Sequence, residues 1–181
     1  MKNQLKKIMN SESIEKKIMR ISHEIMEDDL GEEPILVGIH TRGFPLASRI
    51  KNNIQSFAGV ELLIGSLDIS FHRDDYRSRS LIPELKGTDI NFSIEQKSII
   101  LVDDVLYTGR TIRAAIEGLN SFGRPKIIKL AVLIDRGHRE LPIRGDYIGK
   151  NIPTHDGEHI SVNLSEIDKE DGVFLIQDIN E

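Results

Sequence analysis

The sequence predicts a single α/β domain, residues 1–181, built on a central, mostly parallel sheet flanked by helices. Two observations carry this prediction. Short continuous apolar runs, such as residues 35–39 and 98–104, are typical of strands buried on both faces. Between these runs, apolar residues recur at spacings of three and four, the one-face pattern of an amphipathic helix. Ligands of such alternating α/β chains bind beyond the carboxyl ends of the strands.

The first elements follow directly from these patterns. Isoleucines spaced by four, three and four residues predict a helix over about residues 11–30, and Gly31 is expected to end it. The apolar run at 35–39 predicts a buried strand, and a turn follows it. Pro45 suits the first turn of a helix, so a second helix is predicted from there to about residue 57.

The rest of the chain repeats the alternation. The same patterns predict strands over residues 60–71, 98–104 and 127–134, a helix over 111–122, and short strands near 160–164 and 173–176. The polar, charged stretch after residue 71 predicts a mobile loop able to act as a lid.

Composition narrows the class of protein. The chain has 39% hydrophobic and 29% charged residues, which is ordinary for a globular domain, and it contains no cysteine. Disulfide scaffolds, thiol catalysis and cysteine-bound zinc are therefore excluded. The net charge of -5 argues against a surface built wholly for nucleic acid. Since no signal peptide or membrane-length apolar run is visible, we expect a cytoplasmic protein without membrane contact.

The segment from Asp103 to Thr111 carries the clearest chemical signal. It joins a predicted buried strand to a predicted helix, so its backbone N–H groups surround a helix N-terminus, which favours anions such as phosphate. Gly109 permits close backbone approach, and the hydroxyl of Thr108 adds a donor. The segment predicts a phosphate-binding loop.

Asp103 and Asp104 suggest what lies beside the phosphate. Carboxylates accept hydrogen bonds from vicinal hydroxyls, which a ribose presents close to its 5′-phosphate. Taken alone, an acid pair is more often a helix cap or a metal ligand. An acid pair beside a phosphate loop also suits a ribose phosphate, and these residues alone leave both interpretations open.

Two further loops follow predicted strands. Thr41, Arg42 and Gly43 form one of them, where turn amides and an arginine fork suit diphosphate oxygens, although an ordinary tight turn has the same composition. Asp135, Arg136 and Gly137 form the other. All three loops are expected at the carboxyl edge of the sheet.

Four apolar residues, two acids, two apolar residues, Tyr107 and then Thr-Gly-Arg-Thr resemble the 5-phosphoribosyl 1-diphosphate signature of type I phosphoribosyltransferases. The resemblance implies that fold, a lid loop, and Mg²⁺ bound through the diphosphate rather than by protein ligands. It implies diphosphate contacts from Thr41 and Arg42. Ribose and phosphate contacts are implied for Asp103, Asp104, Val105, Leu106, Tyr107, Thr108, Gly109, Arg110 and Thr111.

Within that family, the chain is similar to the pyrimidine operon regulators that are also uracil phosphoribosyltransferases. The sharpest passages are residues 35–43, 68–75, 100–111 and 130–154. The resemblance implies transfer of ribose 5-phosphate to uracil, which yields UMP. It places Arg136 near diphosphate and base, and backbone groups around Ile160 at the uracil edge. Asp103 and Asp104 are the implied catalytic acids, and we expect Arg73 of the lid, residues 72–91, to join the diphosphate contacts.

The same resemblance implies a second activity, which is uridine-nucleotide-dependent binding of the pyr mRNA leader and transcription attenuation. The basic residues that match the family pattern are Arg20, His23, His138, Arg139, Arg144 and Lys150. Taken singly, each is more simply a solvated charge or a hydrogen-bonded histidine. Acidic residues at 28, 29, 32 and 33 oppose RNA near the end of the first helix. The resemblance also implies a homo-oligomer.

Three other readings stay open. The first is a non-catalytic, nucleotide-sensing regulator that binds RNA. The second is a plain phosphoribosyltransferase without an RNA role. A purine phosphoribosyltransferase would need an aromatic stacker after the Asp-Arg-Gly loop, where Tyr147 is the only nearby candidate. A response-regulator receiver has no use for Thr-Gly-Arg-Thr and is set aside.

Overall fold

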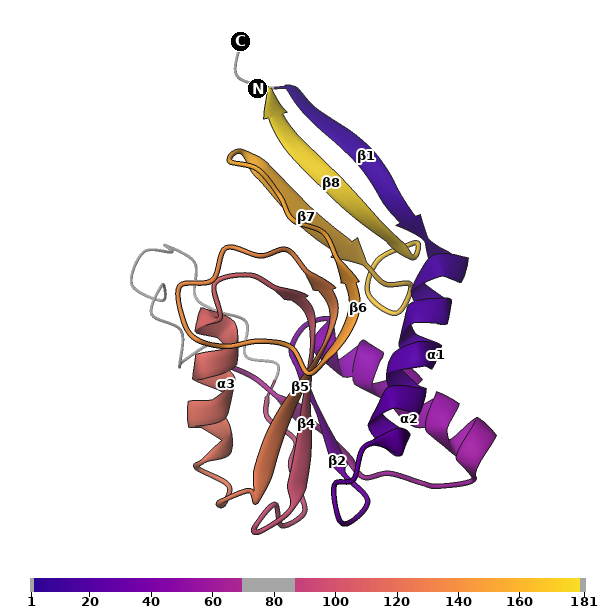
Figure 1. The fold of residues 1–181 in the computed structure, drawn as a ribbon, viewed down its shortest axis with the longest axis vertical. Coiled ribbons are helices and arrows are strands. Elements are labelled where there is room, and N and C mark those ends of the chain that lie inside the picture. The colour runs from indigo at the N-terminus through magenta and orange to yellow at the C-terminus, as the bar shows by residue number, and fades with distance from the viewer. Residues whose placement is uncertain (1, 70–86, 180–181) are drawn as a thin grey trace.

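The computed structural model describes residues 2–69 and 87–179, and its centre is a five-stranded parallel sheet (Figure 1). The strands lie in the order β3-β2-β4-β5-β6, and every neighbouring pair runs parallel. Their bounds are β2 Ile35–Ile39, β3 Ile64–Leu67, β4 Ser98–Leu106, β5 Ile127–Asp135 and β6 Tyr147–Asn151. The predicted parallel sheet is therefore confirmed.

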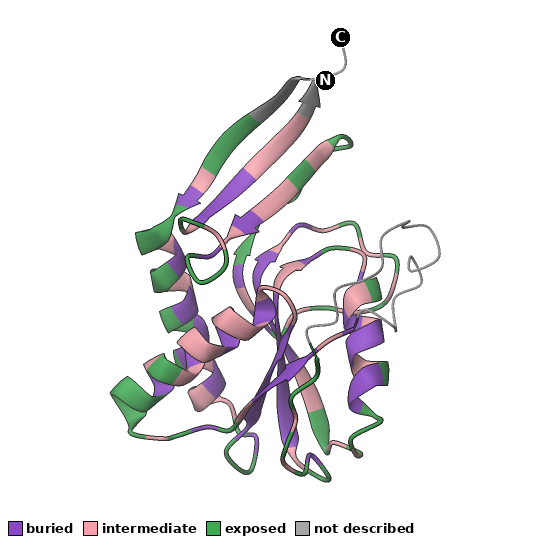
Figure 2. Ribbon diagram, turned by 180° about the vertical axis from the view of Figure 1, so that it is seen from behind, coloured by how far each residue is buried: buried purple, intermediate pink, exposed green. Residues whose placement is uncertain are grey.

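Helices cover both faces of this sheet, as predicted. Helices α1 (Ser11–Glu27) and α2 (Gly43–Ala58) lie on one face, and α3 (Arg110–Leu119) lies on the other. Alternate residues of β4 point to opposite faces, so Ile100 packs with the first pair of helices and Leu101 packs with α3. Figure 2 shows buried residues along the strands and on the helix sides that face them.

A second sheet was not predicted. Three antiparallel strands, in the order β1-β8-β7, lie beyond the carboxyl ends of the parallel strands (Figure 1). Their bounds are β1 Lys2–Asn10, β7 Glu158–Asn163 and β8 Gly172–Ile179. Val162 and Val173 of this sheet join the same buried cluster as Ile14 and Leu46, so the two sheets share one core.

Several predicted boundaries were wrong. The first helix ends at Glu27, before the predicted Gly31, because Asp28 leaves the helix in an extended conformation. The strand predicted over 60–71 pairs only at Ile64–Leu67. The strand predicted over 98–104 continues to Leu106, because Val105 and Leu106 pair with β5. Among the described residues, every helix is too short or too polar to span a lipid bilayer.

Candidate active site

The loop after β4 has the form that the sequence predicts. Helix α3 begins at Arg110, and Gly109 before it has a φ of 93°, which is a left-handed conformation that favours glycine. A Cβ on Gly109 would lie 3.3 Å from the Ile143 side chain, so the neighbouring loop also needs a small residue here. The amide of Glu140 donates to the Thr108 carbonyl at 3.0 Å. The helix N-terminus is thus open to an anion beside a loop that is tied in place.

Asp103 and Asp104 lie near the carboxyl end of β4 and belong to the strand itself. Asp103 is buried, whereas Asp104 is half-buried. The Asp104 amide donates to Asp103 Oδ1 and the Val105 amide donates to Asp104 Oδ1, each at 2.9 Å. Burial raises the pKa of the Asp104 carboxyl, against the opposing effects of the Arg42 charge and the hydrogen bond with Asp103. The charge on Asp104 is therefore sensitive to what binds next to Arg42.

Close packing of α2 brings the loop 40–42 to the acid pair. A Cβ on Gly43 would lie 2.2 Å from the carbonyl oxygen of Val102, and a Cβ on Gly38 would lie 2.3 Å from the Cα of Phe44. Only glycine at these two positions lets the start of α2 lie against β2 and β4. The His40–Thr41 peptide in this loop is cis. The loop therefore adjoins the residues just before Asp103.

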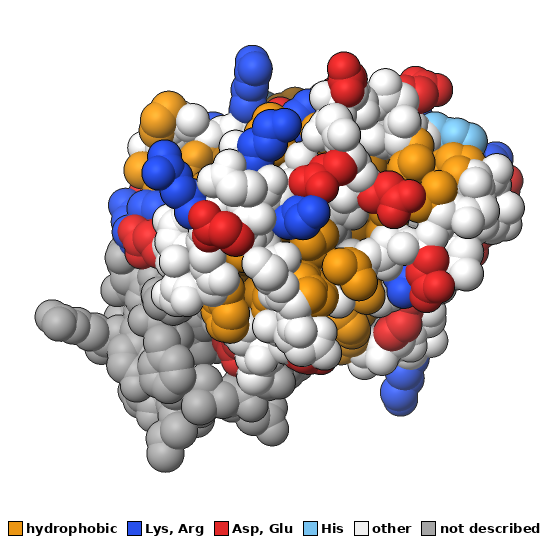
Figure 3. Space-filling model, turned by 90° about the horizontal axis from the view of Figure 1, so that it is seen from below, with side chains coloured by type: hydrophobic (Ala, Val, Ile, Leu, Met, Phe, Trp, Pro, Cys, Tyr) orange, Lys and Arg blue, Asp and Glu red, His pale blue; other side chains and the backbone are white. Residues whose placement is uncertain are grey.

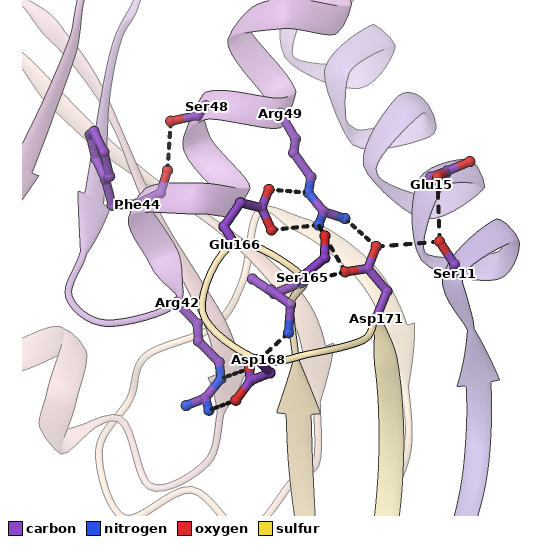
Figure 4. Close-up of polar contacts among 11 residues, drawn as sticks. Ser11, Glu15, Arg42, Phe44, Ser48, Arg49, Ser165, Glu166, Asp168 and Asp171 are labelled. Carbon is purple, nitrogen blue, oxygen red and sulfur yellow. Dashed lines mark hydrogen bonds and ion pairs between the residues drawn. The ribbon is translucent and has the colours of Figure 1, made fainter.

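Arg42 has a partner that the sequence analysis missed. Its Nε and Nη2 donate to the two carboxylate oxygens of Asp168, at 3.1 and 2.9 Å (Figure 4). These hydrogen bonds hold the pKa of Asp168 below its ordinary value. Asp168 lies between β7 and β8, 126 residues after Arg42 in the sequence, so no local pattern signals the pair.

A second arginine of α2 binds the same connection. We call residues 164–171, which join β7 to β8, the strap. Arg49 donates to Glu166 at 2.7 and 2.6 Å and to Asp171 at 2.8 and 2.9 Å, and its Nη2 reaches the Ser165 hydroxyl at 3.1 Å (Figure 4). The strap is therefore tied to α2 at both of its ends.

Arg136 lies on the other side of the acid pair, after β5. It is only 8% exposed. Its Nε donates to Thr154 Oγ1 at 3.2 Å and its Nη2 donates to the Glu158 carbonyl at 2.9 Å. Its Cζ lies 3.9 Å from the centre of the Tyr107 ring. Ile160, the predicted backbone reader, lies half-buried in β7 two residues beyond Glu158.

Tyr147 is not an aromatic stacker for a base. It begins β6, at the amino edge of the sheet, and is 5% exposed. Its hydroxyl donates to Asp28 at 2.7 Å. The ring that the structure places among the site loops is instead that of Tyr107, which is 42% exposed. Tyr147, the candidate that a purine phosphoribosyltransferase would need, therefore does not lie among the site loops.

The basic residues proposed for RNA fall into two groups. Arg20, His23 and Lys150 lie on α1 and β6, where Arg20 donates to the carbonyls of Ile148 and Gly149 at 2.7 and 2.8 Å. Arg20 also pairs with a glutamate of its own helix, and the His23 ring stacks at 4.0 Å on an aromatic ring of α2.

The second group lies on the connection between β5 and β6. Arg139 donates to the carbonyls of Ile143 and Tyr107 and pairs with Asp135, so it organises its own loop. His138 Nε2 lies 2.6 Å from the Thr154 carbonyl. Arg144 is exposed, as is Lys150 of the first group. The end of the molecule that lies away from the antiparallel sheet has acidic, basic and apolar side chains intermixed on its described surface (Figure 3).

The predicted lid lies mostly outside the residues that the structure describes. Arg73 belongs to this part of the lid. The end of that segment is described, and there the amide of Asp89 donates to the Ser66 carbonyl at 2.9 Å, next to β3. Within residues 2–69 and 87–179, no group of three His, Asp or Glu side chains is arranged to hold a metal ion.

Comparison with known proteins shows which family of proteins this fold and these loops belong to. A family model described as the phosphoribosyl transferase domain matches residues 4–167, so the chain belongs to that family. It is similar to a hypoxanthine-guanine phosphoribosyltransferase of Bacillus anthracis, with a TM-score of 0.71 and 20% identity over 97% of this chain and 99% of that one. A hypoxanthine phosphoribosyltransferase of Trypanosoma cruzi, in complex with the product IMP, gives a TM-score of 0.72 at 19% identity, over 94% of this chain and 93% of that one. At such identities these structures show the fold alone.

The sequence relatives are more specific. The chain is 52% identical over 169 residues to a protein of Clostridioides difficile named bifunctional protein PyrR, across 93% of this chain and 96% of that one. A protein of the same name in Caldicellulosiruptor bescii is 53% identical over 173 residues, across 95% of both chains. A third, in Thermus thermophilus, is 52% identical across 93% of both. The resemblance found in the sequence motifs therefore extends along the chain.

Proposed function

We propose that the protein transfers ribose 5-phosphate from 5-phosphoribosyl 1-diphosphate to N1 of uracil, forming UMP and diphosphate. One observation carries the proposal, which is the convergence of three loops at the carboxyl edge of the parallel sheet. Arg42 and Arg136 follow β2 and β5, the two neighbours of β4, and the Asp103–Asp104 pair lies near the end of β4 between them. The resemblance to pyrimidine operon regulators supplies uracil as the acceptor.

Each loop has a part in binding the substrate. The amides and hydroxyls at the start of α3, from Thr108 to Thr111, would hold the 5′-phosphate, because a helix N-terminus favours an anion. Asp103 and Asp104 would accept hydrogen bonds from the ribose hydroxyls. Backbone groups near Ile160 would meet the uracil edge. The ribose would then lie between the diphosphate and the base.

Charge has to be managed as the bond between C1 and the diphosphate oxygen breaks. Positive charge grows on the ribose, and negative charge grows on the leaving diphosphate. Arg42 and the amides near Thr41 would stabilise the leaving group. Magnesium, carried on the diphosphate oxygens, would neutralise part of the same charge. Arg73 of the lid would add a further cation, and unchanged turnover in Arg73→Ala would remove it from this role.

The test is formation of UMP from uracil and 5-phosphoribosyl 1-diphosphate with magnesium, with hypoxanthine and guanine as parallel acceptors. We expect turnover with uracil alone, and a large loss in Asp104→Asn. Glu117→Gln is the matched control, because this carboxylate lies on the exposed side of α3 and pairs only with its helix neighbour Arg113 among the described contacts. Turnover with a purine base and not with uracil would show that uracil is not the substrate. Absence of turnover with every base would favour the nucleotide-sensing regulator.

We further propose that UMP promotes binding to the pyr mRNA leader. Arg144 and Lys150 are the two of the six candidate residues that are exposed and have no side-chain partner among the described residues. Both remain available for phosphate contacts. Arg20, His138 and Arg139 already bind carbonyls or carboxylates of this chain, so their contribution would be to shape the surface.

RNA binding is tested by titrating leader RNA with and without UMP at several salt concentrations. Changing both Arg144 and Lys150 to Gln should weaken binding and flatten its salt dependence, because fewer counterions are released. Lys126→Gln is the control, since Lys126 is exposed at the far end of the sheet. Equal effects from the control would remove these two residues from the interface. The predicted homo-oligomer is measured on the same samples by light scattering.

A further inference from the structure

Tyr107 and Arg136 form a stacked pair across two loops of the site. Tyr107 follows β4, Arg136 follows β5, and the guanidinium carbon lies 3.9 Å from the ring centre. Tyr107 is 42% exposed while Arg136 is 8% exposed. The ring is therefore a partly open cover over a buried cation, an arrangement stabilised by the ring quadrupole.

The other sides of the guanidinium are also held. Nε is bound to Thr154 Oγ1 and Nη2 to the Glu158 carbonyl, and Thr154 is itself only 4% exposed. The Tyr107 ring and the two acceptors therefore contact the guanidinium at three places. No acceptor for Nη1 is found among the described residues, so one edge with two N–H donors is left for a ligand.

Tyr107 is itself fixed in place. Its carbonyl accepts a hydrogen bond from Arg139 Nη1 at 2.8 Å, and the edge of the His138 ring meets its own ring at 6.3 Å between centres. Arg139 pairs in turn with Asp135 at the end of β5. Contacts with Tyr107 thus join the loop after β4 to the loop after β5. The Tyr107 ring is in contact with His138 as well as with Arg136.

We propose that Tyr107 is a positioning residue for the acceptor base. By stacking on Arg136, it holds the free Nη1 edge so that it donates to a carbonyl oxygen of the base. This inference rests on the proposed transfer to uracil and concerns the same site. A fixed donor selects a base with an oxo group, since an amino group in that place would leave the buried cation unsatisfied.

The experiment compares Tyr107→Leu and Tyr107→Phe with the wild-type protein. Loss of a partly desolvated stack should raise KM for uracil by roughly fivefold to tenfold in the leucine variant. KM for 5-phosphoribosyl 1-diphosphate should stay within about twofold, because the proposed phosphate contacts are amides and hydroxyls from Thr108 to Thr111 and do not include the Tyr107 ring. The phenylalanine variant keeps the ring and should recover most of the affinity for uracil.

Calorimetry gives the same comparison without turnover. The leucine variant should bind UMP more weakly than the wild type does, by the same factor. Its affinity for ribose 5-phosphate, which lacks a base, should equal that of the wild type. Equal uracil KM in the leucine and wild-type proteins, or equal weakening of UMP and ribose 5-phosphate, would overturn the inference. Weakening in the phenylalanine variant as large as in the leucine variant would also overturn it, because the hydroxyl and not the ring would then act. A wild-type protein that binds UMP but does not turn over uracil refutes the proposed reaction while still testing the stack.

Discussion

Asp171 offers the sharpest test of how the strap is held on α2. Its carboxylate accepts two hydrogen bonds from Arg49, at 2.8 and 2.9 Å, and one from the Ser165 amide at 2.6 Å. Its side chain is 7% exposed. The Arg49 hydrogen bonds lower the pKa of Asp171 from 3.8 to about 2, against burial, which acts in the opposite direction.

That pKa difference sets the size of the effect. Because the folded pKa is lower than the unfolded one, the ionised carboxyl stabilises the fold above pH 4 and this stabilisation is lost as the pH falls toward 2. At about 1.4 kcal/mol per pH unit, the contribution to the free energy of unfolding is roughly 2 kcal/mol at pH 7. It falls to roughly 1 kcal/mol at pH 3. Asp171→Asn removes the charge and retains an oxygen for the Ser165 amide.

Urea unfolding measures both quantities. At a fixed protein concentration, Asp171→Asn should lower the unfolding free energy by roughly 2 kcal/mol at pH 7 and by about half as much at pH 3. Asp156→Asn is the control, because this exposed carboxylate has no described hydrogen bond, and it should differ from the wild type at neither pH. A loss of the same size at both pH values would refute the argument, since it would show that shape and not charge is responsible.

Three more substitutions test the packing and the site. Gly43→Ala should destabilise the fold by about 2 kcal/mol or more and reduce turnover, because its Cβ would lie 2.2 Å from a carbonyl oxygen of β4; urea unfolding and UMP formation check this. Tyr147→Phe should cost about 1 kcal/mol through the lost hydrogen bond to Asp28, with turnover unchanged because the residue lies at the opposite edge of the sheet. Asp168→Asn should lower KM for 5-phosphoribosyl 1-diphosphate, since the carboxylate that competes with diphosphate for Arg42 loses its charge; a raised KM would show that Asp168 instead orients the guanidinium.

Much of the parallel sheet could be predicted because its signals are local. A strand buried on both faces is a continuous apolar run, and the run Ile35–Ile39 matches β2 at both ends. Two strands of the antiparallel sheet, β7 and β8, match the short strands predicted near 160–164 and 173–176, but β1 was not predicted. In β1 the register pairs Lys7 with Phe174 and Leu5 with Ile176, partners that are far away in sequence. Leu5 is 61% exposed, so β1 lacks the buried run that marked the other strands.

The site divides in the same way. The succession of strand, turn and helix over residues 103–111 was predictable because a strand end with two acids, a glycine and a helix start follow one another along the chain. What surrounds it is assembled from distant segments. Thr154 and Asp168 became recognisable only once the fold placed them against Arg136 and Arg42. Arg139, predicted as an RNA contact, also donates to the carbonyls of Ile143 and Tyr107, which its sequence position did not indicate.

These distant contacts connect the two ends of the proposed substrate. Arg42, on the diphosphate side, is bound to the strap through Asp168, and the strap joins β7 to β8. β7 begins with Glu158, whose carbonyl holds Arg136 on the base side. A diphosphate that displaced Asp168 from Arg42 would therefore act on the strand that carries the Arg136 acceptor. Arg49 fixes both ends of the strap to α2 through Glu166 and Asp171, so Asp168 lies in a connection that is held on either side of it.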